Sequence, residues 1–296
     1  MSETAITMKI NSLEIGDHVP VRIMGVLNAS RESFYQGSYV APDKIGVRAG
    51  DMLTAGADML DVGARSTAPK SAPISVDQEV ERVSLALESL FNTLDLGQTP
   101  VSVDTQFRVV AEAAYRVFEK HGKSNCFVVN DVSCLCADRS LAPWVGEVRC
   151  PVVLMAAHER PGDSLGVGQT LADIRRGVET LERYGKTTGE CTVIDPAIGR
   201  WIPQKTTQHD LVILDCLEQF RCFQLPILVG LSRKSFVGEL LRQQDPGARL
   251  YGTLSATAIA VYNGAHIVRT HDVSRETTDV VQVASALRRA RLQSRE

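Results

Sequence analysis

The sequence predicts an α/β fold, a single (β/α)8 TIM barrel with a parallel eight-stranded core. Short runs of Val, Ile and Leu alternate along the whole chain with longer segments of helical periodicity. A run that is apolar at nearly every position suits a parallel strand that is covered on both faces. Eight such repeats favour a closed barrel over an open sheet.

The apolar runs give the strands in order, and the helical segments lie between them. We expect strands at 21–27, 57–62, 101–103, 126–129, 151–155, 191–194, 227–231 and 266–268. We expect helices at 42–55, 76–94, 107–120, 139–146, 171–184, 208–219, 234–242, 252–263 and 275–291. Segment 252–263 is an extra helix before the last strand. No Pro-, Gly- or Ser-rich linker interrupts the alternation, which favours one domain.

Length and composition agree with a globular protein of 296 residues, 44% hydrophobic and 23% charged. A net charge of −3 argues against a general nucleic-acid binder. No apolar run approaches the roughly 18 residues of a membrane span. Seven cysteines without a CxxC pair suit reduced thiols, so we expect a cytoplasmic protein.

The chain divides into a short N-terminal segment and the barrel. Residues 1–20 carry Ile10, Leu13, Ile15 and Val19, which could form a hairpin that plugs the lower end of the barrel. Residues 21–296 are the predicted barrel domain.

A polar or ionisable side chain ends or follows nearly every predicted strand. The set is Asn28, Asp61, Asp104, Asn130, Asp131, Asp195, Ser232, Arg233, Lys234, Arg269 and His271, with His158 further along its loop. Barrel enzymes build their active sites at this edge. Any one Asp or Asn could merely cap a helix, but the set, with Lys, Arg and His included, indicates an enzyme.

Several short motifs at these strand ends resemble dihydropteroate synthase and, more broadly, the pterin-binding barrel family. They are MGVLN at 24–28, ESF at 32–34, GADMLDVG at 56–63, ST at 66–67, SVDT at 102–105, NDVS at 130–133, DP at 195–196, GLSRKS at 230–235 and RTHDV at 269–273. Their order and spacing along nearly the whole chain make the resemblance specific.

The resemblance implies a reaction that joins an arylamine to 6-hydroxymethyl-7,8-dihydropterin diphosphate and expels diphosphate. Asp104, Asn130 and Asp195 would bind the donor-rich edge of the pterin, because carboxylates accept hydrogen bonds and an amide does both. Lys234 would reach the pterin carbonyl or a ring nitrogen.

Asn28, Arg269 and His271, with Lys234, match the family's catalytic and anion-binding region. Arg269 offers a fork of donors for phosphate oxygens. Asn28 would hold Mg²⁺ together with the diphosphate. Catalysis would then be mainly positioning and electrostatics, and no nucleophilic residue is required.

Two loops, 29–39 and 63–75, are expected to close the site. Ser33, Phe34, Ser66 and Thr67 match the family's loop motifs. A larger group is expected at the arylamine side and in these loops: Ser33, Phe34, Arg65, Ser66, Thr67, Arg200 and Ser235.

The sequence departs from the commonest bacterial pattern at the arylamine side. Arg65 precedes the Ser-Thr pair where Glu is usual, and Arg200 stands where an aromatic residue would pack on the arylamine. These changes resemble the archaeal, tetrahydromethanopterin-type branch, whose arylamine is 4-(β-D-ribofuranosyl)aminobenzene 5′-phosphate. Arg200 could reach that phosphate with help from Arg65, Lys70 or Lys205, or it could pair with the carboxylate of p-aminobenzoate or lie in solvent.

Two other functions share the barrel. A methyltransferase that moves a methyl group from a methylpterin to a corrinoid protein keeps the pterin-binding residues but needs no diphosphate site. A non-catalytic pterin-binding module would tolerate the altered loops. The Ser232-Arg233-Lys234 run and the pair of Arg269 and His271 favour the synthase over the methyltransferase. A binding module is disfavoured by the intact set of Asn28, Asp104, Asn130, Asp195, Lys234, Arg269 and His271. The partners expected are small molecules, with no nucleic acid or membrane, and the resemblance implies a homodimer.

Overall fold

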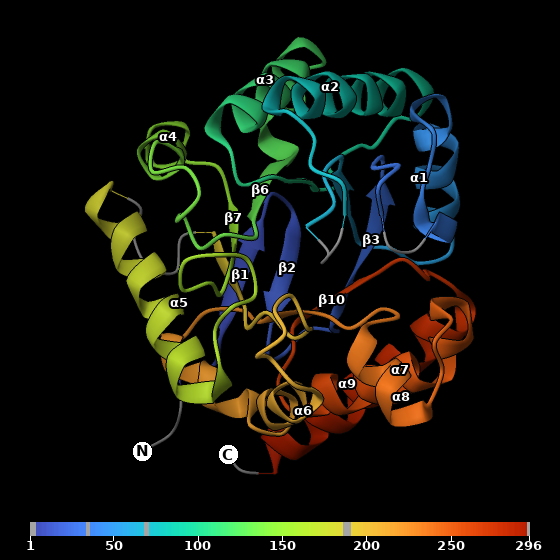
Figure 1. The fold of residues 1–296 in the computed structure, drawn as a ribbon, viewed down its shortest axis with the longest axis vertical. Helices are drawn as coiled ribbons and strands as arrows, with labels where there is room; N and C mark the ends of the chain where they lie inside the picture. The colour runs from blue at the N-terminus through green and yellow to red at the C-terminus, as the bar shows by residue number, and fades with distance from the viewer. Residues whose placement is uncertain (1–3, 34–35, 68–70, 186–190, 295–296) are drawn as a thin grey trace.

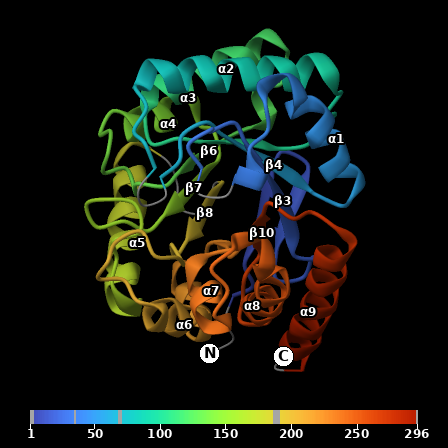
Figure 2. The same ribbon diagram turned by 45° about the vertical axis from the view of Figure 1, so that its right-hand side comes forward.

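The computed structural model describes residues 4–33, 36–67, 71–185 and 191–294. Its centre is a ring of parallel strands surrounded by helices, as Figures 1 and 2 show. The strands are β3 (Arg22–Asn28), β4 (Met59–Gly63), β5 (Val101–Asp104), β6 (Phe127–Asp131), β7 (Val152–Met155), β8 (Thr192–Asp195), β9 (Leu228–Gly230) and β10 (Ile267–Thr270).

The eight strands form one parallel sheet in the order β8-β7-β6-β5-β4-β3-β10-β9. A parallel bridge between Ile194 and Ile227 joins β8 to the start of β9 and closes the ring. The predicted (β/α)8 barrel is therefore confirmed, and each predicted strand lies within two residues of an observed one.

Helices pack around the outside of the ring (Figure 1). They are α1 (Ile45–Thr54), α2 (Val76–Thr93), α3 (Arg108–Lys120), α4 (Leu141–Val148), α5 (Gly166–Arg183), α6 (Thr207–Asp215), α7 (Ser235–Leu241), α8 (Leu250–Tyr262) and α9 (Arg275–Gln293). Short 3₁₀ turns are η1 (Gln36–Ser38), η2 (Pro42–Lys44), η3 (Ser124–Cys126), η4 (Leu217–Phe223) and η5 (Pro246–Arg249). No helix in the described part of the chain has the length and apolar character needed to span a bilayer.

Two helices differ from the sequence prediction. Helix α5 begins five residues before the predicted 171, because Gln169 accepts a hydrogen bond from the Leu165 backbone and supports a first turn without an apolar pattern. The single helix predicted at 208–219 is instead α6 followed by η4. Cys216 lies at the junction, where the chain tightens into 3₁₀ geometry.

The interior of the barrel is layered, because inward-facing positions recur at every second residue of each strand. The lowest layer is apolar and consists of Met24, Met59, Val128, Val153, Val193, Leu228 and Ile267. Two residues further along, four of these strands place a polar or charged side chain inward, at Asp61, Asn130, Asp195 and Arg269. The barrel interior is therefore apolar at the amino ends of the strands and polar at their carboxyl ends.

An antiparallel hairpin of β1 (Thr7–Ile10) and β2 (Leu13–Gly16) covers the apolar end. Met8, Ile10 and Ile15 pack into the lowest interior layer, and Figure 1 shows the hairpin in the middle of the ring. Asp17 then accepts hydrogen bonds from Arg221 and Arg288, two arginines of the helical layer. The hairpin is therefore held by both apolar and ionic contacts.

Candidate active site

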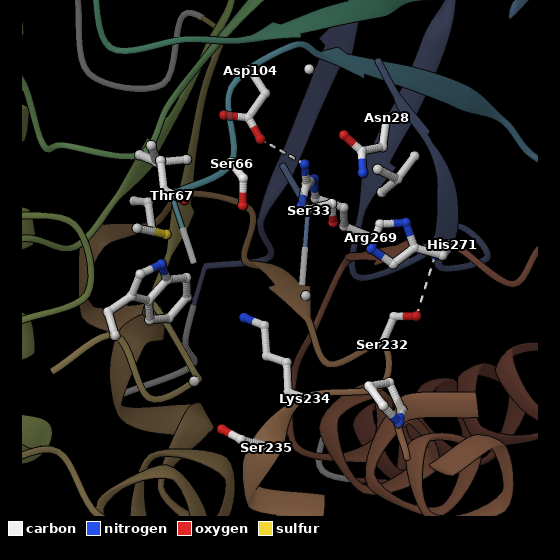
Figure 3. A pocket seen from close by; sticks show the side chains of 18 of the residues that line it. Asn28, Ser33, Ser66, Thr67, Asp104, Ser232, Lys234, Ser235, Arg269 and His271 are labelled. Carbon is white, nitrogen blue, oxygen red and sulfur yellow. Dashed lines mark hydrogen bonds and ion pairs between the residues drawn. The ribbon is translucent and has the colours of Figure 1, made fainter. Parts of the chain in front are cut away.

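A cavity of about 540 Å³ opens at the carboxyl ends of the strands. Its wall includes residues from every strand of the barrel, all on the inward-facing register. They are Val26, Asn28, Gly63, Asp104, Asn130, Met155, Asp195, Gly230 and Arg269. Figure 3 shows the side chains of Asn28, Asp104, Lys234, Arg269 and His271 gathered around this space.

Arg269 forms the charged floor of the cavity with two carboxylates. Its Nε donates to Asp61 at 2.7 Å and its Nη2 donates to Asp104 at 2.7 Å. Asp61 is fully buried and also accepts hydrogen bonds from Ser102 and Asn130. The two carboxylates hold the guanidinium plane in a fixed orientation.

Asp104 sits at the upper rim of this floor. Burial raises the pKa of Asp104 to about 7, and the Arg269 guanidinium opposes that rise. For Arg269 itself, burial disfavours the charged form, but the two carboxylates outweigh it and raise the pKa above its ordinary value. Arg269 therefore stays charged at any physiological pH.

Lys234 lies across the cavity from Asp104 (Figure 3). Its ammonium donates to the Ile198 carbonyl and lies 4.5 Å from the centre of the Trp201 ring. Burial lowers the pKa of Lys234 to about 8, and Asp195 partly offsets that loss of charge. Asp195 accepts from the Ala197 backbone at 2.7 Å, and burial raises the pKa of its carboxyl.

Asn28 anchors the first loop at the opposite side of the cavity. Its Nδ2 donates to Ser38 at 2.8 Å, and its Oδ1 accepts from the Ser30 backbone at 2.9 Å. Ser33 also lines the cavity and lies 3.4 Å from Ser38, Oγ to Oγ. Phe34, the other residue expected from this loop, falls outside the described residues.

His271 lies beside Asn28 and Arg269 in Figure 3. Burial lowers the pKa of His271 to about 4, and the Arg269 charge adds to that effect. The imidazole is therefore neutral at pH 7. The His271 backbone donates to Ser232, whose loop is held by a bidentate pair of Arg233 with Asp272.

Arg65, Ser66 and Thr67 of the second loop line the cavity, but the Arg65 charge is turned toward the protein. Arg65 pairs with Glu79, which is fully buried at the start of α2, and it donates to the Ile74 carbonyl at 2.8 Å. Arg65 therefore already has partners within the protein, and its support of a substrate phosphate stays a prediction. Lys70 lies outside the described residues.

Arg200 and Lys205 are also engaged within the protein. Arg200 lines the cavity, but its Nη1 pairs with Glu239 of α7 at 2.5 Å. Lys205 is fully buried and donates to the Ala197 carbonyl, so the expectation that it contacts a substrate phosphate is wrong. Ser235 lines the cavity at the start of α7, as the resemblance implies.

Among the residues of the site that were not assigned a role from the sequence, three have polar or aromatic side chains that shape it. Asp61 belongs to the charged floor, Trp201 forms part of the wall, and Arg249 reaches the wall from η5 while donating to backbone carbonyls. Asp61 could have been found from the sequence, because it lies at the carboxyl end of a predicted strand. Trp201 follows Arg200 directly, and the backbone conformation that turns its ring to the cavity leaves no sequence pattern.

One oxygen atom of the site suits the Mg²⁺ that the resemblance implies. Asn28 Oδ1 is a hard oxygen ligand with a second lone pair beyond the one that Ser30 uses. Within the described residues no group of three or more His, Cys, Asp or Glu could hold a metal. Such an ion would take its other ligands from diphosphate and water, as Mg²⁺ commonly does.

Comparison with known proteins gives consistent matches over nearly the whole chain. The sequence profile of the pterin binding enzyme family matches residues 24–271. Dihydropteroate synthase of Mycobacterium leprae is 35% identical over 281 residues, which cover 90% of this chain and 93% of that protein. The Escherichia coli K12 dihydropteroate synthase is 32% identical over 274 residues, covering 89% and 90%.

Solved structures agree with these sequence matches. A Yersinia pestis dihydropteroate synthase in a sulfonamide drug complex has a TM-score of 0.81 and 29% identity, covering 95% of this chain and 99% of that one. The Xanthomonas albilineans dihydropteroate synthase with 4-aminobenzoic acid has a TM-score of 0.78 and 29% identity, covering 96% and 98%. All four relatives are bacterial, and none supports the expected likeness to the tetrahydromethanopterin branch.

Proposed function

Since the chain belongs to the pterin-binding enzyme family, as a dihydropteroate synthase-type transferase of folate synthesis, we propose its substrates and the roles of its residues. The substrates are 6-hydroxymethyl-7,8-dihydropterin diphosphate and p-aminobenzoate, and the products are dihydropteroate and diphosphate. The observation that carries the proposal is the single cavity in which Asp104, Asn130, Asp195 and Lys234 face one another above the charged floor.

The pterin lies against these four side chains. Asp195 and Asp104 accept hydrogen bonds from its N–H donors, and Asn130 adds an amide that can donate or accept. Lys234, as an ammonium, donates to the pterin carbonyl or a ring nitrogen. Burial makes these bonds strong, because the same groups left without a partner would be costly to keep out of water.

The diphosphate lies toward Asn28, Arg269 and His271. Arg269 already uses Nε and Nη2 for its carboxylates, so Nη1 is the part of the fork that reaches a phosphate oxygen. His271 is neutral and acts as a hydrogen-bond donor rather than as a charge. Asn28 holds the Mg²⁺, which neutralises charge on the departing diphosphate.

Catalysis is mainly positioning and electrostatic stabilisation. Loss of diphosphate breaks the C–O bond at the exocyclic methylene, and the electron-rich dihydropterin stabilises the cation that forms. The arylamine nitrogen then attacks that carbon and loses a proton. Arg269 and His271 stabilise the leaving group, while Asp104, Asn130, Asp195 and Lys234 hold the ring for attack.

We propose p-aminobenzoate as the arylamine because the two arginines that the resemblance places at the arylamine side are engaged. Arg65 pairs with Glu79, and Arg200 pairs with Glu239. A second candidate is the ribosyl aminobenzene phosphate, since Arg200 lines the cavity and could exchange Glu239 for a phosphate. If Arg200→Ala leaves the KM for that phosphate unchanged, the second candidate fails.

We also propose that the protein is a cytoplasmic homodimer. The chain has seven cysteines and no CxxC pair, which suits reduced thiols and a reducing compartment. An exposed apolar groove runs between α8 and α9, lined by Ile259, Tyr262, Val280, Val283 and Leu287. A second copy of the chain can cover this groove with the same groove of its own, as a two-fold dimer requires.

The assigned roles predict which substrate each variant affects. Asp195→Asn and Lys234→Met should raise the KM for the pterin diphosphate by about 10- to 100-fold, the cost of a lost hydrogen bond to a charged group. The KM for p-aminobenzoate should change little. Ser235→Ala should show the reverse pattern. Steady-state kinetics with each substrate varied tests this, and an effect of Asp195→Asn on the arylamine alone would contradict the pterin assignment.

A further inference from the structure

Behind the cavity wall lies a pair of charged residues that no substrate role explains. Lys205 and Asp210 are both fully buried, and Lys205 Nζ lies 3.9 Å from Asp210 Oδ1. Asp210 Oδ2 is buried and has no hydrogen-bond partner among the described residues. A buried pair of this kind contributes little net stability compared with apolar residues of similar size. The presence of this pair therefore calls for another reason.

Both residues bind the backbone of the turn that follows β8. Lys205 donates to the Ala197 carbonyl at 2.5 Å, and Asp210 accepts from the Gly199 N–H at 2.8 Å. Ala197 has a φ of +58° and Gly199 a φ of +137°. Left-handed backbone at a residue with a Cβ persists only when its surroundings fix it. Lys205 and Asp210 hold the turn in this conformation from its side away from the cavity.

The cavity side of the same turn carries the pterin-binding residues. Asp195 accepts from the Ala197 N–H, and Lys234 donates to the Ile198 carbonyl. The turn therefore has Lys205 and Asp210 on one face and Asp195 and Lys234 on the other. A shift of the turn moves the partners of both pterin-binding side chains at once.

Trp201 links the two faces. Its ring centre lies 4.5 Å from the Lys234 ammonium and 5.8 Å from the Lys205 ammonium. Gly199 lies so close that a Cβ there would stand 2.8 Å from the Trp201 ring and 3.0 Å from Lys234. The surroundings of the Trp201 indole therefore depend on the positions of both Lys234 and Lys205.

We propose that Lys205 and Asp210 are a positioning pair that holds the 195–201 turn, and through it Asp195 and Lys234, in the arrangement that binds the pterin. The proposal rests on the pterin site proposed above. It adds two residues that touch no substrate and assigns them control of substrate affinity.

Kinetics and stability separate positioning from simple structural support. Lys205→Met and Asp210→Asn should each raise the KM for the pterin diphosphate by about tenfold or more, with a smaller effect on the KM for the arylamine. Each single variant leaves one buried charge uncompensated and should lower the Tm. The double variant removes both charges and should recover most of the Tm, but its KM should stay high.

The pH profile gives a second readout. Lys234 faces Asp195, Asp210, Arg269 and Lys205, and of these the two carboxylates favour its ammonium form. Asp210→Asn should therefore move the alkaline limb of kcat/KM, which we expect near pH 8 in the wild type, to lower pH. The matched control is Asp58→Asn, a half-buried carboxylate that accepts from the Ile23 backbone at the other end of the barrel. Asp58→Asn should lower the Tm without moving the alkaline limb of kcat/KM.

Trp201 fluorescence keeps the test independent of turnover. In a Trp144→Phe background Trp201 is the remaining tryptophan, and Lys205→Met should change its emission while Asp58→Asn should not. If the wild type shows no synthase activity, the proposed function fails and the emission still tests the pair. KM values and an alkaline limb that match those of Asp58→Asn, or unchanged emission of Trp201, would overturn the proposal.

Discussion

Arg269 is the residue on which the charge balance of the cavity floor depends. It is the cation between Asp61 and Asp104, and Asp61 is fully buried. Arg269→Met should destabilise the protein by about 3–5 kcal/mol, because it leaves a buried carboxylate uncompensated. It should also lower kcat/KM by at least about 100-fold through loss of leaving-group stabilisation. Chemical denaturation and steady-state kinetics measure the two effects.

A double variant separates these two roles of Arg269. Asp61→Asn combined with Arg269→Met removes the fully buried carboxylate together with the cation, and the introduced amide can still bond to Ser102 and Asn130. Stability should largely return while activity stays low. If Arg269→Met alone were within about 1 kcal/mol of the wild type, the charged floor would not be a stabilising unit.

His266 should make the protein sensitive to mild acid. Its Nδ1 accepts from the Ile227 backbone at 3.0 Å, which requires an unprotonated nitrogen, and burial lowers its pKa to about 4. The unfolded chain binds a proton near pH 6.5 and the folded chain does not. Stability is therefore complete above about pH 6.5 and is lost as the pH falls toward 4, by about 3 kcal/mol for this residue.

The imidazole of His271 titrates in the same window, since its pKa is also lowered to about 4. His266→Asn keeps an acceptor for Ile227 but cannot titrate, so it should remove the contribution of His266 to the acid slope. Denaturation midpoints measured from about pH 4.5 to 7 test this. An unchanged slope in His266→Asn would show that His266 is not held neutral.

The partners and the depth of single side chains could not be predicted from the sequence. The resemblance identified Arg65 and Arg200 as cations near the arylamine, but their partners, Glu79 and Glu239, lie on helices whose contacts the sequence does not show. Asp61 ends a predicted strand like Asp104, yet it lies one interior layer deeper. Depth depends on strand register, which a motif does not encode.

At the scale of elements, the N-terminal hairpin can be tested apart from the site. Ile10 is fully buried in the lowest interior layer, at the end of the barrel opposite the cavity. Ile10→Ala should cost about 2–5 kcal/mol, as large-to-small core substitutions do. Because the cavity is remote, the KM values should not change.

A substitution at an exposed residue serves as the control for the stability loss of Ile10→Ala. Val47 lies on α1 and is 57% exposed, so Val47→Ala should change stability by less than about 0.5 kcal/mol. If Ile10→Ala behaved like Val47→Ala in urea denaturation, the hairpin would not be part of the cooperative core. A raised KM for the pterin would contradict the separation of the two ends.

Elements with a strong apolar pattern could be predicted from the sequence, whereas elements with a weak apolar pattern could not. Parallel strands are apolar at nearly every position, so all of the barrel strands were found. The first turn of α5 and the break after Asp215 depend on side-chain bonds and tight turns rather than apolar spacing. The positive φ at Ala197 and Gly199, which turns Trp201 to the cavity, is equally invisible in the sequence.

At the scale of the whole molecule, the groove between α8 and α9 predicts a dimer. Val283 and Leu287 are 63% and 58% exposed on α9. Val283→Asp should place a charge in the proposed interface and give a monomer, while Val47→Asp, at a similarly exposed valine of α1, should stay dimeric. Sedimentation velocity decides between these outcomes. A monomeric wild type, or a dimer that survives Val283→Asp, would contradict the proposed interface.

Diphosphate release measures the proposed reaction of the protein most directly. The purified chain is given 6-hydroxymethyl-7,8-dihydropterin diphosphate and Mg²⁺ with p-aminobenzoate, with the ribosyl aminobenzene phosphate, or with neither. We predict release that depends on the arylamine and has a higher kcat/KM with p-aminobenzoate. Release with the ribosyl phosphate alone would contradict the proposed arylamine, and no release with either would contradict the synthase reaction itself.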